Sequence, residues 1–308
     1  MAAADMPAHL RRAQWRRLGK TLGLAFLLPG IVFSGILLYA GTWPAFIAVG
    51  SASMQHDDNA SAFGVMDVGD LVLIQAISSP DELVTYVEGR ATGYATYGDF
   101  GDVVILRDLD VVVNQGLVLH RALTSVVWNI TACLTCYDVP ELRLLDNSEW
   151  DAWNATGNAT GIPTDEPLGL VRFVLRDAGW RQDREIDFRM WEIRLRVSGA
   201  GILTLGDNNL YPEPTGFDKW IVPLSEVVGV ARGEIPWFGL VPLTLFPEPL
   251  RCCAAWGSTD PDLGAPANSW RSLEIALIAI VGSCAGAYAA SSYVDRRRRR
   301  ARVKETVG

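Results

Sequence analysis

The sequence predicts a mostly β domain flanked by two membrane-spanning helices. Two segments, residues 21–56 and 275–294, contain no charged side chain. Each can supply the roughly 20 apolar residues that cross a bilayer core. Between them, short β-branched runs are interrupted by Gly and Asp, a pattern typical of strands joined by turns. We expect the first helix within residues 21–43 and the second within residues 270–294.

Basic side chains gather at the two ends of the chain. Residues 1–20 hold five and residues 295–308 hold seven of the 27 Lys and Arg residues, and residues 21–294 carry a net charge of −17. Basic flanks mark the cytoplasmic side of a membrane span. We therefore expect a two-span protein of the cell membrane, with cytoplasmic tails at 1–20 and 295–308 and an extracytoplasmic body between them. The Arg-rich end, adjoining a span, favours contact with anionic membrane lipid over nucleic acid.

Each apolar segment has an alternative interpretation. The first could be a cleavable signal peptide, but it exceeds the 7–15 apolar residues of such a core, which favours a retained anchor. The second could be a buried helix of a soluble domain. It contains Gly282-x-x-x-Gly286, which suits close helix packing inside a membrane.

Several motifs follow one another between the apolar segments. Val49-Gly-Ser-Ala-Ser-Met comes first, and strand patterns then begin at Gly69 and Gly101. The next run is Leu117-Val-Leu-His-Arg-Ala, and a Gly206-Asp-Asn-Asn box comes later. In this order the motifs resemble type I signal peptidases of the archaeal and endoplasmic-reticulum branch, over roughly residues 22–122 and 202–245. That branch has a histidine followed by arginine where bacterial members have a lysine base, and no lysine lies between the serine and Gly-Asp-Asn boxes here.

The resemblance implies a membrane-anchored serine endopeptidase with the antiparallel β fold of signal peptidases. It would remove signal peptides from secreted preproteins. By the same resemblance Ser53 is the nucleophile, Ser51 helps to hold the oxyanion and His120 is the general base. A serine hydroxyl needs a neighbouring base to become a good nucleophile, and an imidazole can take its proton and return it to the leaving amine.

The third catalytic residue is open between two carboxylates. Asp207 lies in the Gly-Asp-Asn box and Asp218 follows it, while the usual short spacing of the family would place Glu213 at the acidic position. We favour Asp218 as the partner of His120, with Asp207 as a carboxylate behind it. His56 lies in a polar loop close to Ser53, and we expect it to be a bystander.

The extracytoplasmic body divides into three parts. We expect a first catalytic part at 44–123, an insert at 124–200 that forms a surface subdomain, and a second catalytic part with a loop at 201–269. Four sequons for N-glycosylation lie in this body, at Asn59, Asn129, Asn154 and Asn158. Four cysteines outside the membrane favour disulfides over a zinc site: Cys133, Cys136, Cys252 and Cys253. We expect no cofactor and no metal.

The expected partners are signal-peptide-bearing preproteins and membrane lipid, at a location near the secretion channel. A specialised set of surface proteins is an alternative class of substrate. The alternative function is a non-enzymatic, membrane-anchored extracellular β domain that serves surface assembly or binding. Intact Ser53 and His120 in the family order favour the peptidase, and the uncertain third residue and the insert favour the binding domain.

Overall fold

A computed structural model of the 308-residue chain describes a large part of it. The described residues are 23, 26–107, 116–159, 169–193, 199–211, 217–247, 252–253, 255–258 and 264–307. Glu213, one of the acidic residues considered above, and the N-terminal tail 1–20 lie outside them.

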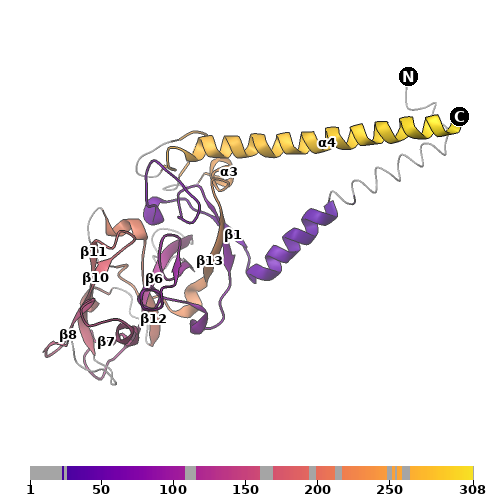
Figure 1. Cartoon of the computed structure of the whole chain (residues 1–308). Helices are drawn as coiled ribbons and strands as arrows, with labels where there is room; N and C mark the ends of the chain where they lie inside the picture. Colours follow the sequence, from indigo (N-terminus) through magenta and orange to yellow (C-terminus); the bar gives the residue numbers. More distant parts are fainter. Residues whose placement is uncertain are drawn as a thin grey trace.

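Antiparallel strands make up most of the described body, as the sequence predicts (Figure 1). The large sheet has the order β1-β2-β13-β5-β6-β7-β10-β8-β9, with β11 paired to β10 and β12 paired to β6, and β3 with β4 forms a separate hairpin. The strands are β1 (Phe46–Ala48), β2 (Leu71–Gln75), β3 (Ala95–Thr96), β4 (Asp99–Phe100), β5 (Val103–Arg107), β6 (Leu117–Trp128), β7 (Tyr137–Asp138), β8 (Trp150–Asn154), β9 (Gly157–Asn158), β10 (Leu170–Ala178), β11 (Arg184–Arg189), β12 (Ala200–Leu205) and β13 (Val227–Ile235).

Short helices connect the strands. They are η2 (Ala52–Met54), η3 (Pro80–Glu82), α2 (Tyr86–Thr92), η4 (Pro140–Leu144), η5 (Met190–Glu192), η6 (Asp207–Leu210), η7 (Leu224–Glu226) and α3 (Leu240–Leu245), and a long helix α4 (Ser269–Val307) ends the described chain. Helix α2 shows how local sequence fixes such an element. Thr85 caps its first turn by accepting a hydrogen bond from the backbone of Glu88, and Gly93 ends it in the left-handed conformation.

Two apolar helices leave the β domain in the same direction (Figure 1). One of them, over Ser269–Val294 within α4, is the single described helix long and apolar enough to cross a membrane. The other, Phe26–Ala40, is shorter. It ends because Gly41 adopts the left-handed conformation with φ 63°, so the helix does not continue to residue 43.

Of the expected pair of spans, the described residues thus support the one at 270–294 and not the one at 21–43, of which residues 21, 22, 24 and 25 lie outside the described ranges. The backbone of the basic segment after Val294 continues α4 as far as Val307.

The insert at 124–200 is part of the same fold and not a separate surface subdomain. Strand β6 crosses its expected N-terminal boundary, and β7, β10, β8 and β9 continue the large sheet from β6. One hydrophobic core joins Phe173 and Ile186 of the insert to Tyr86 of α2 and Leu203 of β12. The insert strands lie at the end of the domain away from the two apolar helices (Figure 1).

Candidate active site

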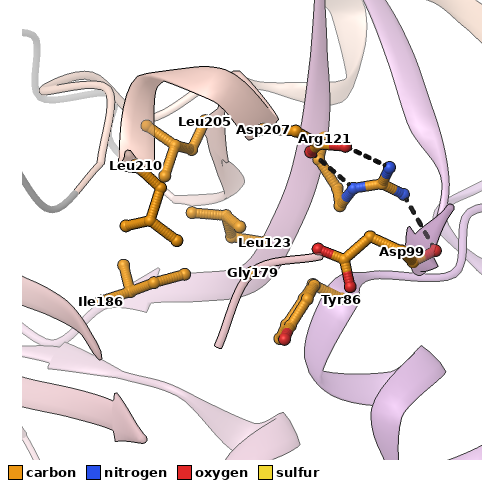
Figure 2. Close-up of a pocket in the computed structure, with 9 residues that line it drawn as sticks. All are labelled: Tyr86, Asp99, Arg121, Leu123, Gly179, Ile186, Leu205, Asp207 and Leu210. Atoms are coloured by element: carbon orange, nitrogen blue, oxygen red, sulfur yellow. Dashed lines mark hydrogen bonds and ion pairs between the residues drawn. The ribbon is translucent and has the colours of Figure 1, made fainter. Parts of the chain in front are cut away.

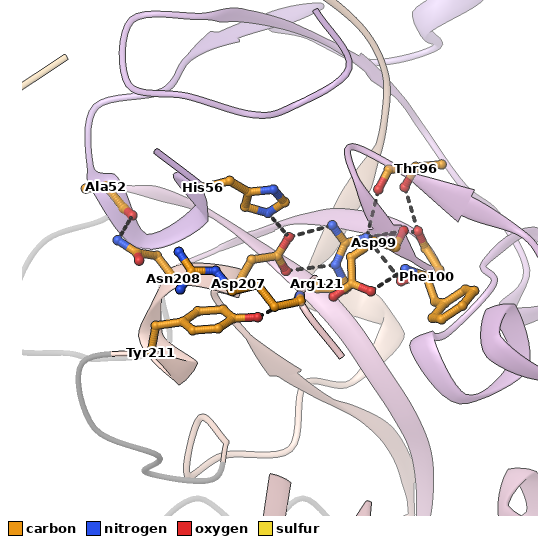
Figure 3. Close-up of polar contacts among 11 residues, drawn as sticks. Ala52, His56, Thr96, Asp99, Phe100, Arg121, Asp207, Asn208 and Tyr211 are labelled. Atoms are coloured by element: carbon orange, nitrogen blue, oxygen red, sulfur yellow. Dashed lines mark hydrogen bonds and ion pairs between the residues drawn. The ribbon is translucent and has the colours of Figure 1, made fainter. Parts of the chain in front are cut away.

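Ser53 lies in the serine turn, residues 50–55, which follows β1. Two backbone hydrogen bonds fix the entry to this turn, from Val49 N to the oxygen of Asp70 and from Gly69 N to the oxygen of Val49, both 2.9 Å. Within the turn, the Asn208 side chain donates to the backbone oxygen of Ala52 at 2.9 Å (Figure 3). The turn is therefore attached to both η6 and the loop before β2.

Gly206 brings the end of β12 directly against the serine. A Cβ atom built on Gly206 would lie 2.5 Å from the backbone oxygen of Ser53 and 2.9 Å from its Cβ. No side chain fits in that space, and this steric exclusion explains why the Gly-Asp-Asn box has a glycine at this position. Leu205, the residue before it, is paired with Arg121 of β6, which places Ser53 near the part of β6 that carries His120.

Ser51 lies beside Ser53. Their hydroxyl oxygens are 3.4 Å apart, and either one can donate. Ser51 is exposed and has extended backbone angles, with φ −139° and ψ 155°, directly before η2. Its hydroxyl is close enough to the predicted nucleophile to contact an oxyanion formed there.

His120 and Asp218 form a hydrogen-bonded pair. His120 Nδ1 and Asp218 Oδ2 are 2.6 Å apart, and the two side chains are 12% and 14% exposed. Thr204 in β12 donates its hydroxyl to the same Asp218 oxygen at 2.8 Å, and Asp218 N donates to the oxygen of Thr204 at 2.9 Å. Asp218, and not Asp207, is thus the carboxylate that contacts His120.

Two opposed effects act on the protonation of His120. Burial lowers the pKa of His120, but the charge of Asp218 and the hydrogen bond to it act the other way and prevail, so the pKa lies above the ordinary value of 6.5. With Asp218 accepting at Nδ1, the neutral ring leaves Nε2 free to accept a proton. That is the tautomer a general base needs.

The turn of Ser53 lies next to β6, the strand that carries His120. The serine turn packs on β6 and on η6, and no hydrogen bond from Ser53 Oγ to His120 occurs among the described contacts. Catalytic hydrogen bonds are often long in enzymes without substrate and shorten when substrate is bound.

Asp207 belongs to a second buried network, around Arg121. The Arg121 guanidinium donates to both Asp207 oxygens, at 2.8 and 2.6 Å, and the two side chains are 1% and 3% exposed. Arg121 also donates to four backbone oxygens of the β3–β4 hairpin, those of Thr96, Asp99, Phe100 and Gly101 (Figure 3). Burial opposes ionisation of Asp207, but the charge of Arg121 prevails and holds the pKa of Asp207 below its ordinary value.

A small cavity of about 10 Å³ adjoins this network. Figure 2 shows Arg121, Asp207 and Asp99 grouped at one end of it and the apolar side chains of Leu210 and Ile186 at the other. Burial first, and then the nearby charge of Asp207, raises the pKa of Asp99 to about 6. A space of this volume holds at most one water molecule, so this cavity is not a substrate site.

His56 is not a free residue of a polar loop. Its Nε2 lies 3.0 Å from Asp207 Oδ2, and its side chain is only 8% exposed. Its ring stacks on Trp180 of the insert with centroids 4.6 Å apart. The network Arg121–Asp207–His56 therefore joins the serine turn, β6 and the insert.

The structure thus arranges the residues that the sequence singles out as two pairs and one separate carboxylate. Ser51 and Ser53 share the serine turn, His120 pairs with Asp218, and Asp207 stands apart on Arg121 and His56. Sequence analysis did not identify Thr204, Asn208 or Trp180. Asn208 belongs to the Gly-Asp-Asn box and Thr204 lies two residues before its glycine, which was a usable signal, whereas nothing in the sequence indicated the stacking of Trp180 on His56.

The cysteines outside α4 form two disulfides. Cys133 pairs with Cys136 in the insert, and Cys252 pairs with its neighbour Cys253. Cys252 N also donates to the backbone oxygen of Gly50 at 2.8 Å. The second disulfide therefore lies directly behind the serine turn.

Comparison of the sequence with models of known protein families gives no match, and comparison with curated proteins gives none either. The resemblance to type I signal peptidases consequently rests on the quoted motifs, their order and the residues of this site.

Proposed function

We propose that the chain is a membrane-anchored serine endopeptidase that removes signal peptides from preproteins. The observation that carries the proposal is the His120–Asp218 hydrogen bond of 2.6 Å on the strand beside the turn of Ser53. Two residues that are 98 positions apart in the sequence meet here in the way that a base and its orienting carboxylate do.

In the proposed reaction, His120 Nε2 takes the Ser53 proton as Oγ attacks the substrate carbonyl. Asp218 holds the ring in the required tautomer and stabilises the imidazolium that forms. The Ser51 hydroxyl donates to the oxyanion, and His120 then protonates the leaving amine. Water hydrolyses the acyl-enzyme by the same route, and Ser53 regains its proton.

The apolar helices support the membrane part of the proposal. Side chains such as Phe26, Leu28 and Ile278 are 75%, 64% and 72% exposed, and long exposed apolar surfaces of this kind suit lipid. We propose both helices as anchors with cytoplasmic ends, since they leave the β domain in one direction (Figure 1). The shorter one then needs apolar residues before Phe26. Substrates held in the same bilayer by a signal peptide would reach the site near the membrane surface.

The test is cleavage of a preprotein by the full chain in membranes. We expect wild type to cut at the signal-peptide junction and Ser53→Ala and His120→Ala to lose about 10³-fold or more in kcat. His56→Phe keeps a flat ring against Trp180 and should retain most activity, since His56 has no catalytic role in this proposal. Activity of Ser53→Ala equal to that of wild type would refute the proposal.

The same assay separates the peptidase from a non-enzymatic surface domain. If wild type cuts none of several preproteins, the binding domain becomes the better interpretation. If His56→Phe is inactive and His120→Ala is active, the second histidine is the base and the assignment of the pair is wrong.

A further inference from the structure

Three of the four N-glycosylation sequons lie wholly within the described residues, those at Asn59, Asn129 and Asn154. The fourth, at Asn158, ends at Thr160, outside them. A sequon accepts a bulky, hydrophilic glycan on the Nδ2 atom of its Asn, and its third residue must carry a hydroxyl. The folded chain accommodates such a glycan only where Nδ2 faces solvent, and the three sequons differ in this respect.

The sequon at Asn154 forms the turn between β8 and β9. The partly exposed Asn154 accepts three hydrogen bonds at Oδ1, from Thr156 N at 2.9 Å, Thr156 Oγ1 at 2.8 Å and Gly157 N at 3.0 Å. Because a carboxamide is planar, with oxygen and nitrogen on opposite sides of its carbon, these bonds point Nδ2 away from the turn. None of the hydrogen bonds among the described residues uses this Nδ2, and Thr156 and Gly157 are exposed.

The sequon at Asn129 has similar local bonds but a different use of Nδ2. Asn129 Oδ1 accepts from Thr131 Oγ1 at 2.7 Å and from Ala132 N at 3.1 Å. Its Nδ2, however, donates to both carboxylate oxygens of Asp138, at 3.0 and 3.2 Å. A glycosylated amide keeps only one N–H, so a glycan on Asn129 would break one of these bonds and compete with Asp138 for space. The contacts of Asn129 therefore exclude a glycan.

The sequon at Asn59 is closed at its third residue. Asn59 is exposed, but Ser61 is only 6% exposed. Ser61 Oγ accepts from Trp237 Nε1 at 3.1 Å. The Asn268 side chain also bonds Ser61 N at 2.8 Å and Ser61 O at 3.1 Å. The hydroxyl that the sequon requires therefore lies inside the domain, out of reach of a transferase.

We propose that Asn154 carries an N-linked glycan and that Asn59 and Asn129 do not. The co-reactant is a lipid-diphosphate-linked oligosaccharide. Asn154 Nδ2 forms a bond to the anomeric carbon of its first sugar, and the bond from that carbon to the diphosphate breaks. The amide gives up one proton, and the lipid diphosphate leaves. Because the transfer takes place on the extracytoplasmic side, this inference rests on the membrane topology in the proposed function.

The position of this turn gives the glycan a role. Strand β8 lies at the end of the domain away from the apolar helices (Figure 1), so a glycan on its last residue stands clear of the membrane. Strand β9 is the last in the order of the large sheet. An unprotected sheet edge can pair with a strand of another chain, and a bulky, hydrophilic group beside β9 prevents that pairing.

The test expresses the full chain in cells that attach N-glycans to extracytoplasmic proteins. Asn158→Gln is present throughout, so that its sequon does not contribute. We expect mass spectrometry of the purified protein to find a glycan on Asn154 and none on the other two Asn residues. Asn154→Gln and Thr156→Ala should each abolish the electrophoretic shift that the glycan causes, and Thr156→Ser should keep it. The matched controls Asn129→Gln and Thr131→Ala make the same changes at the other turn and should leave the shift unchanged.

Digestion of intact cells with trypsin separates two ways of failing. If the β domain is digested from outside and Asn154 carries no glycan, or if Asn59 or Asn129 carries one, this inference alone is overturned. If the domain is protected until the membrane is broken, the extracytoplasmic placement in the proposed function fails and this inference with it. Neither readout depends on preprotein cleavage, so loss of the peptidase assignment would not affect the result.

Discussion

Replacing Asp218 by asparagine tests the His120–Asp218 pair without changing its shape. Asp218 Oδ2 accepts from His120 at 2.6 Å and from Thr204 at 2.8 Å. Both bonds go to this one oxygen, so an asparagine with its NH₂ group at that position turns a donor toward His120, and the Thr204 hydroxyl rotates to accept. The ring then has to accept at Nδ1 and carry its proton on Nε2, where it cannot act as a base. We expect kcat to fall by about 10³- to 10⁴-fold, or about 4 to 5.5 kcal/mol in activation free energy.

The pH dependence gives a second readout of the same substitution. In wild type the charge of Asp218 outweighs burial and keeps the pKa of His120 above 6.5. Without that charge, burial is opposed only by the charge of Asp207, so the pKa of His120 falls. A base works in its neutral form, so the acidic limb of kcat/KM should move to lower pH in Asp218→Asn as the plateau drops.

Stability should change with pH in a defined direction. Because folding raises the pKa of His120, the pair stabilises the fold fully below about pH 6.5, the unfolded pKa, and loses this stabilisation as pH rises through the folded pKa. Asp218→Asn should therefore lose more unfolding free energy at pH 5.5 than at pH 8.5. The control is Asp187→Asn, which makes the same chemical change at an ion pair with Arg172 in the insert. If Asp218→Asn stays within about threefold of wild type in kcat, with an unchanged acidic limb, the pair does not drive catalysis.

Three further perturbations follow from the structure. Asp207→Ala leaves the buried Arg121 without its carboxylate and should cost about 3–5 kcal/mol of unfolding free energy, measured by denaturant titration; a loss below about 1 kcal/mol would contradict this account of the network. Gly206→Ala places a Cβ 2.5 Å from the backbone oxygen of Ser53, whereas a Cβ at Gly233 meets nothing closer than 3.9 Å. Gly206→Ala should therefore lower kcat/KM by about 10- to 100-fold, and the control Gly233→Ala should not. Equal activities of the two variants would show that the close approach of Gly206 to Ser53 has no role. Burial, followed by neighbouring carboxylates, raises the pKa of Asp67 to about 7, so its ionisation destabilises the fold as pH rises from about 4 to 7; Asp67→Asn should raise the melting temperature at pH 8 more than at pH 5, and the reverse order would refute the assignment.

Much of the catalytic arrangement could be predicted from the sequence because it is carried by short motifs. Turn and strand patterns around Ser53 and His120 indicate a β domain, and the structure has one. The choice of Asp218 over Asp207 as the partner of His120 agrees with the observed hydrogen bond, although catalysis itself remains a proposal. These predictions succeed because each depends on local backbone geometry and on residue chemistry.

The remaining features depend on contacts between distant parts of the chain. His56 was expected in a polar loop, but its side chain is buried and contacts Asp207 and Trp180, which lie 151 and 124 positions away. The C-terminal end of the first helix, at Ala40, depends on the left-handed residue Gly41, which a hydropathy pattern does not detect. The insert was expected to form a surface subdomain, yet Phe173 and Ile186 are buried in the shared core.

The continuity of β6 has a consequence for any attempt to simplify this protein. A 12-residue strand carries His120 near its beginning, and its last residues pair with β7 of the insert. Excising residues 129–199 would uncover Leu123 and Val126, which are now 3% and 0% exposed, and would remove most of the core cluster to which Leu203 of β12 belongs. A minimal version of the chain would therefore need a redesigned apolar surface on these two strands, and the insert is best regarded as a structural half of the domain.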